Sequence, residues 1–157
     1  MPICLFQNSV KASEVLKMSW DSYIDNLIAQ TKDASGKAHC DKACIIGLDG
    51  GAPWTTSNHP NALELNHSEA QTISRCFRNK DFSLFMCSGV DVDGNQYMFL
   101  RVVDDKIVLA KRADLGCLTL QASKTAIIIA HTAEGFQFGN VNKGVNVIAE
   151  YLESLDM

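Results

Sequence analysis

The chain has 157 residues, of which 46% are hydrophobic and 20% charged, and this size and composition predict one globular domain with a buried core. Its formal net charge of −4 at pH 7 leaves no basic excess of the kind that draws proteins to nucleic acid, so we expect no nucleic-acid partner. The apolar runs are far shorter than the roughly 20 residues of a membrane-spanning helix, and Met1 to Leu5 do not resemble a signal peptide; a cytoplasmic protein without a transmembrane segment is therefore predicted.

The first predicted element is a helix that begins at Ser19, because serine caps helix N-termini well. Apolar side chains recur along it at i, i+3, i+4, i+7 and i+8, and they form one stripe of Trp20, Tyr23, Ile24, Leu27 and Ile28. We assign residues 1–17 to an N-terminal extension, for which the sequence leaves disorder open, and residues 18–157 to the domain.

Two strands about a tight turn are predicted next, over residues 43–48 and 53–56. Ser68 to Gln71 have the spacing of a capping box and predict a second helix. Short strands separated by turn residues follow over residues 84–92, 96–103, 106–111, 117–122 and 125–132. Asn140 is predicted to cap a last helix with a single apolar stripe. This order of elements is typical of an α+β protein with an antiparallel sheet.

Several separate segments of residues 18–157 resemble the profilin family. The segment from Ser19 to Leu27 is similar to the family's first helix, and Gly50-Gly51-Ala52-Pro53-Trp54 stands where profilins carry their second tryptophan. Glu134-Gly135 with the segment from Gly139 to Lys143 resembles the turn into the last helix, and Tyr151-Leu152 stands where the family completes its proline site. The extension over residues 1–17 departs from the usual pattern, and so does Met157, which replaces the terminal tyrosine of vertebrate profilins.

The resemblance implies a profilin-like fold, with the N- and C-terminal helices packed on one face of a central antiparallel sheet and a short helix on the other. It implies an actin-monomer-binding protein that regulates actin polymerisation and nucleotide exchange, binds proline-rich ligands in an aromatic groove, and catalyses no reaction. The implied partners are one actin monomer, proline-rich proteins such as formins, and anionic phosphoinositide lipids. A monomeric, cytoskeleton-associated protein without cofactor or metal is expected.

The resemblance also places the binding residues. The implied poly-proline site consists of Trp20, Tyr23, Asn26, Trp54, Tyr151 and Leu152, whose rings could stack on prolines and whose N–H and O–H groups could donate to ligand carbonyls. The implied actin site consists of Phe85, Met86, Cys87, Arg101, Lys111, Arg112, Thr119, Gln121, Phe136, Gln137, Gly139, Asn142 and Lys143. The cations expected to attract phosphoinositides are Arg101, Lys111, Arg112 and Lys124.

Two other classes of protein remain open at this point. One is a proline-peptide adaptor without actin binding. The other is a small thiol or histidine enzyme, which would pair one of Cys40, Cys44, Cys76, Cys87 or Cys117 with His39, His59, His67 or His131. Nothing in the sequence supports the enzyme, because it shows no phosphate-binding glycine loop and no local nucleophile signature.

Overall fold

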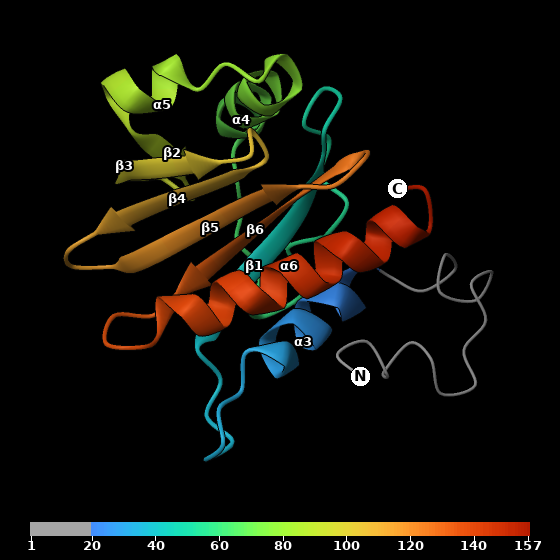
Figure 1. Ribbon diagram of the computed structural model, residues 1–157, viewed down its shortest axis with the longest axis vertical. Coiled ribbons are helices and arrows are strands. Elements are labelled where there is room, and N and C mark those ends of the chain that lie inside the picture. The colour runs from blue at the N-terminus through green and yellow to red at the C-terminus, as the bar shows by residue number, and fades with distance from the viewer. Residues whose placement is uncertain (1–19) are drawn as a thin grey trace.

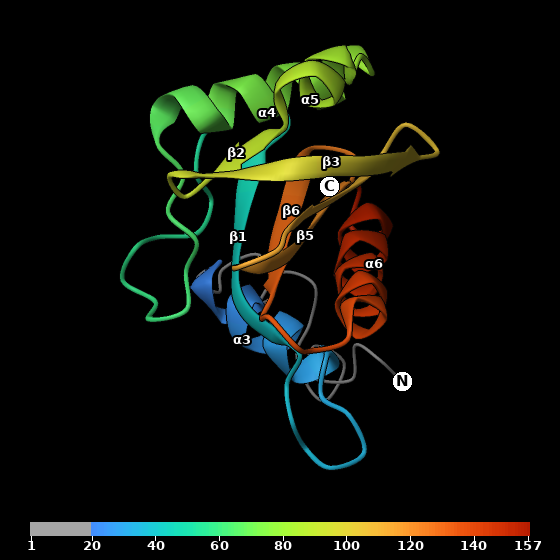
Figure 2. The same ribbon diagram turned by 90° about the vertical axis from the view of Figure 1, so that its left-hand side faces the viewer.

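The structure is a computed structural model that describes residues 20–157, so the predicted extension and the predicted cap at Ser19 lie outside the described residues. A curled six-stranded antiparallel sheet with strand order β1-β6-β5-β4-β3-β2 forms the centre (Figures 1 and 2). Its strands are β1 (Cys40–Gly47), β2 (Val90–Val92), β3 (Asn95–Val103), β4 (Ile107–Arg112), β5 (Gly116–Ala122) and β6 (Ala126–Thr132). The described helices are α3 (Asp21–Gln30), α4 (His67–Asn79), α5 (Ser83–Ser88) and α6 (Phe138–Ser154).

Helices cover both faces of the sheet. Helices α3 and α6, which are the first and last helices of the described part of the chain, lie on one face, while α4 and α5 lie on the other (Figure 2). Because successive side chains of a strand point to opposite faces, Ile127 and Ile129 of β6 join the core under α4 and α5, and Ile128 joins the core under α3 and α6. The predicted α+β fold class is confirmed.

Helices α3 and α6 approach each other closely at Gly144. A Cβ atom built on Gly144 would lie 3.0 Å from the Thr31 methyl group and 3.6 Å from Leu27 Cδ1. Thr31 is fully buried, and its hydroxyl donates to the Ile28 carbonyl (2.8 Å) while accepting from the His39 and Cys40 N–H groups. A glycine therefore sets the distance between the two helices.

The edge of the sheet at β1 is covered by the loop that follows it. The Trp54 N–H donates to the Ile45 carbonyl (2.9 Å), the Ala43 N–H donates to the Asn61 carbonyl (3.0 Å), and the Leu63 N–H donates to the Ala43 carbonyl (3.0 Å). The predicted strand over residues 53–56 is reduced to one isolated bridge between Pro53 and Ile46. The loop satisfies backbone groups that an open edge strand would expose.

The N-cap of helix α4 lies two residues before the cap predicted at Ser68. Asn66 is the cap: its side chain accepts from the Glu69 N–H (2.8 Å), and the Glu69 carboxylate accepts from the Asn66 N–H (3.0 Å). The same carboxylate accepts from the Asp93 and Gly94 N–H groups, which ties the β2–β3 turn to the helix. Glu69 thus closes a capping box that Asn66 opens three residues earlier, and the box predicted from Ser68 is wrong.

The predicted strand over residues 84–92 is wrong in its first half, which is helix α5. The Asp81 carboxylate accepts from the Ser83 N–H and hydroxyl, which starts a helical turn, and Gly89 ends it with φ +80°. Phe82 and Phe85 are buried three residues apart against Phe77, so the apolar spacing is helical. The predicted cap of the last helix is also displaced, because α6 begins at Phe138, before Asn140.

No helix within residues 20–157 has the length and apolar character needed to span a membrane.

Candidate functional site

Two tryptophans and two tyrosines from three parts of the chain form an aromatic cluster, which we define as Trp20, Tyr23, Trp54 and Tyr151. The Trp20 ring centroid lies 4.7 Å from that of Trp54 and 4.8 Å from that of Tyr23, with tilted planes. Both indoles are half-buried, whereas Tyr23 is 1% exposed. The cluster therefore presents indole surface to solvent and rests on a buried phenol.

Helix α6 supplies the fourth ring. Tyr151 is half-buried, and burial raises its pKa. Burial, and secondly the electrostatic effect of Tyr151, raise the pKa of Tyr23. Tyr151, Trp20 and Trp54 all pack against the hydrophobic core cluster that contains Tyr23. The structure thus brings together the four aromatic residues of the implied proline site.

Two other predicted members of the proline site are placed differently. Leu152 is fully buried beneath the cluster, where it supports the rings and offers no surface to a ligand. The Asn26 side chain donates to the Ser22 carbonyl of its own helix (2.9 Å), which occupies one of its donors.

The position of Trp54 depends on the end of β1. Its indole Nε1 lies 3.2 Å from the point where a Cβ on Gly47 would be, which is closer than most Cβ contacts, so a larger residue at position 47 would press on the ring. Its backbone N–H is bonded to Ile45, as described above. Gly47 and Ile45 together fix Trp54 against the sheet edge.

The residues of the implied actin site divide by exposure. Met86, Cys87, Arg101, Lys111, Gln137, Gly139 and Lys143 are exposed, and Arg112, Phe136 and Asn142 are half-buried. Phe85, Thr119 and Gln121 are buried, so a partner protein cannot touch them in this conformation. Thr119 and Gln121 instead donate side-chain hydrogen bonds to Asn142 and Asn146 and so hold α6 on β5.

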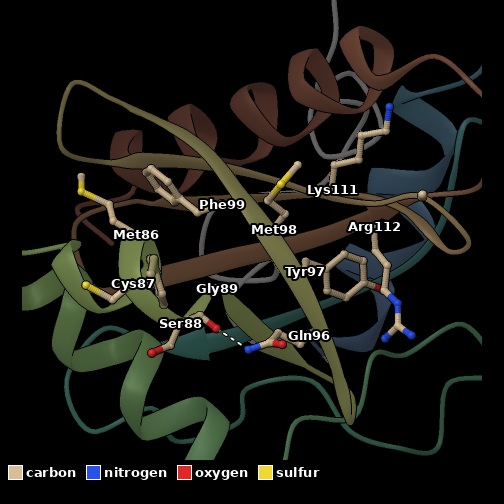
Figure 3. A pocket seen from close by; sticks show the side chains of 12 residues that line it. Met86, Cys87, Ser88, Gly89, Gln96, Tyr97, Met98, Phe99, Lys111 and Arg112 are labelled. Carbon is tan, nitrogen blue, oxygen red and sulfur yellow. Dashed lines mark hydrogen bonds between the residues drawn. The ribbon is translucent and has the colours of Figure 1, made fainter.

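A hollow of about 610 Å³ lies where α5 meets the ends of β3 and β4. Figure 3 shows Met86 and Cys87 of α5 on one side of β3, with Lys111 and Arg112 of β4 on the other. Met98 also lines it and is 64% exposed. Met98 was not predicted as a site residue, although an apolar side chain between Tyr97 and Phe99 in an alternating strand is the signal that could have identified it.

The four predicted lipid-binding cations do not form one patch. Arg112 pairs with Asp114 (2.9 Å), and Lys124 pairs with Asp156. Lys124 follows Ala122, the last residue of β5, whereas Lys111 pairs with Cys117 near the start of that strand. The two lysines therefore lie at opposite ends of β5. Among residues 20–157, Arg101 and Lys111 form no ion pair and remain available to an anion.

The geometry gives the thiol-enzyme alternative no support. Burial raises the pKa of Cys40 to about 12 and also raises that of Cys44, which disfavours the reactive thiolate. The side chains of His39, His59 and His131 bond to aspartates. Within the described part of the chain, His, Cys, Asp and Glu residues form no cluster suited to a metal ion.

The sequence model of the profilin family matches residues 18–157. The chain belongs to the profilin family. A profilin from Clypeaster japonicus is 68% identical over 140 residues, which are 89% of this chain and 100% of the relative. Profilins are binding proteins and not enzymes, and their function is to regulate actin and to bind proline-rich ligands.

Solved profilins share the fold. The profilin IB structure from Acanthamoeba castellanii superposes with a TM-score of 0.70 at 25% identity, covering 88% of this chain and 100% of that one. Mouse profilin IIa, solved in complex with a double repeat from the FH1 domain of mDia1, superposes with a TM-score of 0.64 at 20% identity, covering 89% of this chain and 100% of that one. At that identity the mouse structure establishes the fold alone.

Proposed function

We propose that this profilin binds one actin monomer through a basic face around Lys111 and a proline-rich segment through the aromatic cluster. The observation that carries the proposal is the contact of Trp20 with Trp54 at 4.7 Å, made by residues from different elements of the fold. A polyproline II segment has little conformational entropy to lose and can stack its rings on such a surface. The mouse profilin solved with an FH1 repeat supports formins as one source of this ligand.

The strand order separates the two surfaces. Trp54 follows β1 at one edge of the sheet, whereas the hollow beside Lys111 is built by β3, β4 and α5 toward the other edge. We therefore expect the protein to hold actin and a proline-rich partner at the same time. Binding with preference for one conformation of actin would shift actin toward that conformation and so change its nucleotide exchange.

The proposed actin surface consists of the accessible residues of the implied site. They are Met86, Cys87, Arg101, Lys111, Arg112, Phe136, Gln137, Gly139, Asn142 and Lys143. Lys111 and Arg101 are also the proposed lipid-binding cations, so anionic phosphoinositides and actin should compete. A monomeric, cytoplasmic and cytoskeleton-associated protein fits this pair of ligands.

Two measurements test the proposal. Calorimetric titration with a proline decapeptide should show binding to the wild type and none to Trp54→Ala. In a pyrene-actin assay the wild type should slow polymerisation, and Lys111→Glu should reduce this effect. Lys42→Glu makes the same charge change at the exposed position of β1 and is the matched control. Proline binding without any effect on actin would favour the adaptor and contradict the actin assignment.

A further inference from the structure

The loop that carries Trp54 is bonded to the helix that carries Trp20. The Asp21 carboxylate accepts from the Thr56 N–H at 2.6 Å and from the Thr56 hydroxyl at 2.5 Å. Asp21 directly follows Trp20, and Thr56 lies two residues after Trp54. This two-bond contact therefore connects the chain segments beside the two indoles.

A second contact lies one helical turn further along α3. His59 Nε2 is 2.7 Å from Asp25 Oδ1, and the Asn61 N–H donates to His59 Nδ1 (2.9 Å). Because Nδ1 accepts a hydrogen bond, we assign the imidazole proton to Nε2, which then donates to Asp25. The His59 side chain is 10% exposed and the Asp25 side chain 72% exposed.

The other end of this loop is bonded to the sheet. The Asn61 side chain donates to the Asp41 carbonyl (3.0 Å), and the Asn61 carbonyl accepts from the Ala43 N–H. His59 thus lies between α3 and a segment fixed to β1. Through this loop, the position of α3 is coupled to that of the sheet edge on which Trp54 rests.

We propose that Asp21, Asp25 and His59 are positioning residues of the proline-ligand site, an inference that rests on the proposed function. They hold α3 against the loop over residues 55–61, so that Trp20 and Trp54 meet the ligand as one fixed surface. A surface that is already ordered loses less entropy when the ligand binds. Hydrogen bonds to exposed carboxylates contribute little to folding, so their effect should appear mainly in ligand affinity.

Two substitutions of His59 separate the turn from the contact with α3. In His59→Asn the side-chain oxygen can still accept from the N–H of Asn61, two residues later, as in an Asx-turn. The shorter side chain does not reach Asp25, so the bond to α3 is lost. In His59→Gln the longer amide can still donate to Asp25. Thr56→Val is the second variant: it removes the bond from the Thr56 hydroxyl to Asp21 and the bond that this hydroxyl accepts from the Asn58 N–H (3.2 Å), and it keeps the Thr56 N–H bond to Asp21.

The proline-decapeptide Kd, measured by calorimetry, is the first readout. We expect it to rise roughly fivefold in His59→Asn and in Thr56→Val, a change equivalent to the typical net contribution of one hydrogen bond. His59→Gln should remain within about twofold of the wild type, and the potency in the pyrene-actin assay should be unchanged in all three variants.

Near-ultraviolet circular dichroism is the second readout, because the chain has only two tryptophans and their coupling requires a fixed mutual orientation. The tryptophan signal should weaken in His59→Asn and persist in His59→Gln. Unchanged peptide affinity in both His59→Asn and Thr56→Val, with wild-type binding intact, would overturn the positioning role. Failure of the wild type to bind the peptide would instead overturn the proposed function.

Discussion

Replacing Gly144 by alanine should destabilise the protein, although alanine is the better helix former. The exchange gains about 1 kcal/mol of helix propensity in the interior of α6. Against this, the new methyl group would lie 3.0 Å from the Thr31 Cγ2, closer than a normal contact. Overpacking of this kind costs about 1–3 kcal/mol. The free energy of unfolding should therefore fall by up to about 2 kcal/mol.

Thr31 has no easy way to relieve this contact. A rotation about χ1 that moved its methyl group away would also break the bonds of its hydroxyl to Ile28, His39 and Cys40. Thr31→Ser removes the methyl group and keeps the hydroxyl. The double variant should thus recover part of the stability that Gly144→Ala loses, with a coupling of about 1 kcal/mol.

Urea unfolding of the wild type, both single variants and the double variant measures this coupling. Gly139→Ala is the matched control, because no atom lies within 4 Å of a Cβ built there and α6 continues through it; it should be neutral or stabilising. If Gly144→Ala raises stability as much as the control does, or if the two substitutions at positions 31 and 144 act additively, the steric argument is wrong.

Three further predictions concern single hydrogen-bonded groups. Asn66→Ala should lower the free energy of unfolding by about 1 kcal/mol in urea unfolding, since it removes the cap of α4. Glu69→Gln should cost about 1–3 kcal/mol in the same assay and speed amide hydrogen exchange at Gly94, because one carboxylate oxygen that accepts N–H bonds becomes an N–H₂ donor. Hydrogen bonds, the largest from Ser35 and the next from His39, hold the pKa of Asp33 below its usual range. The ionised Asp33 therefore stabilises the folded state at neutral pH, and this stabilisation is lost as the pH falls below about 4. Asp33→Asn should therefore be less stable than the wild type at pH 7, with a difference that narrows in acid; a difference that grew in acid would contradict the assignment.

The periodic parts of the fold were predictable from the sequence. Tyr23, Ile24 and Leu27 recur at helical spacing, and the structure buries all three on the face of α3 that meets the sheet. The strand over residues 125–132 was predicted within one residue, because a central strand covered on both faces is apolar throughout. Residues 84–88 were predicted incorrectly as a strand, because a short apolar run is compatible with a strand as well as with a helix. Phe82, whose spacing from Phe85 indicates a helix, lies before this run.

The site was predictable only in part. The resemblance to profilins predicted that Trp20, Trp54 and Tyr151 lie together, which the spacing of residues along the chain cannot do, and the structure packs all three against one core cluster. The bonds between Asp21 and Thr56 join residues 35 positions apart and carry no local pattern. The burial of Thr119 and Gln121 was also missed, because polar residues on a strand are usually assigned to a solvent-exposed face, whereas here α6 covers them.

The loop that covers the β1 edge has two roles that cannot change independently. The segment that seals the outermost strand against pairing with another chain is also the segment that presents Trp54. A substitution that loosens it to accommodate a different ligand would uncover backbone donors and acceptors at the same time, and aggregation should increase. We therefore expect variation in proline-ligand preference to arise more readily on the α6 side of the aromatic cluster, where no sheet edge has to be protected.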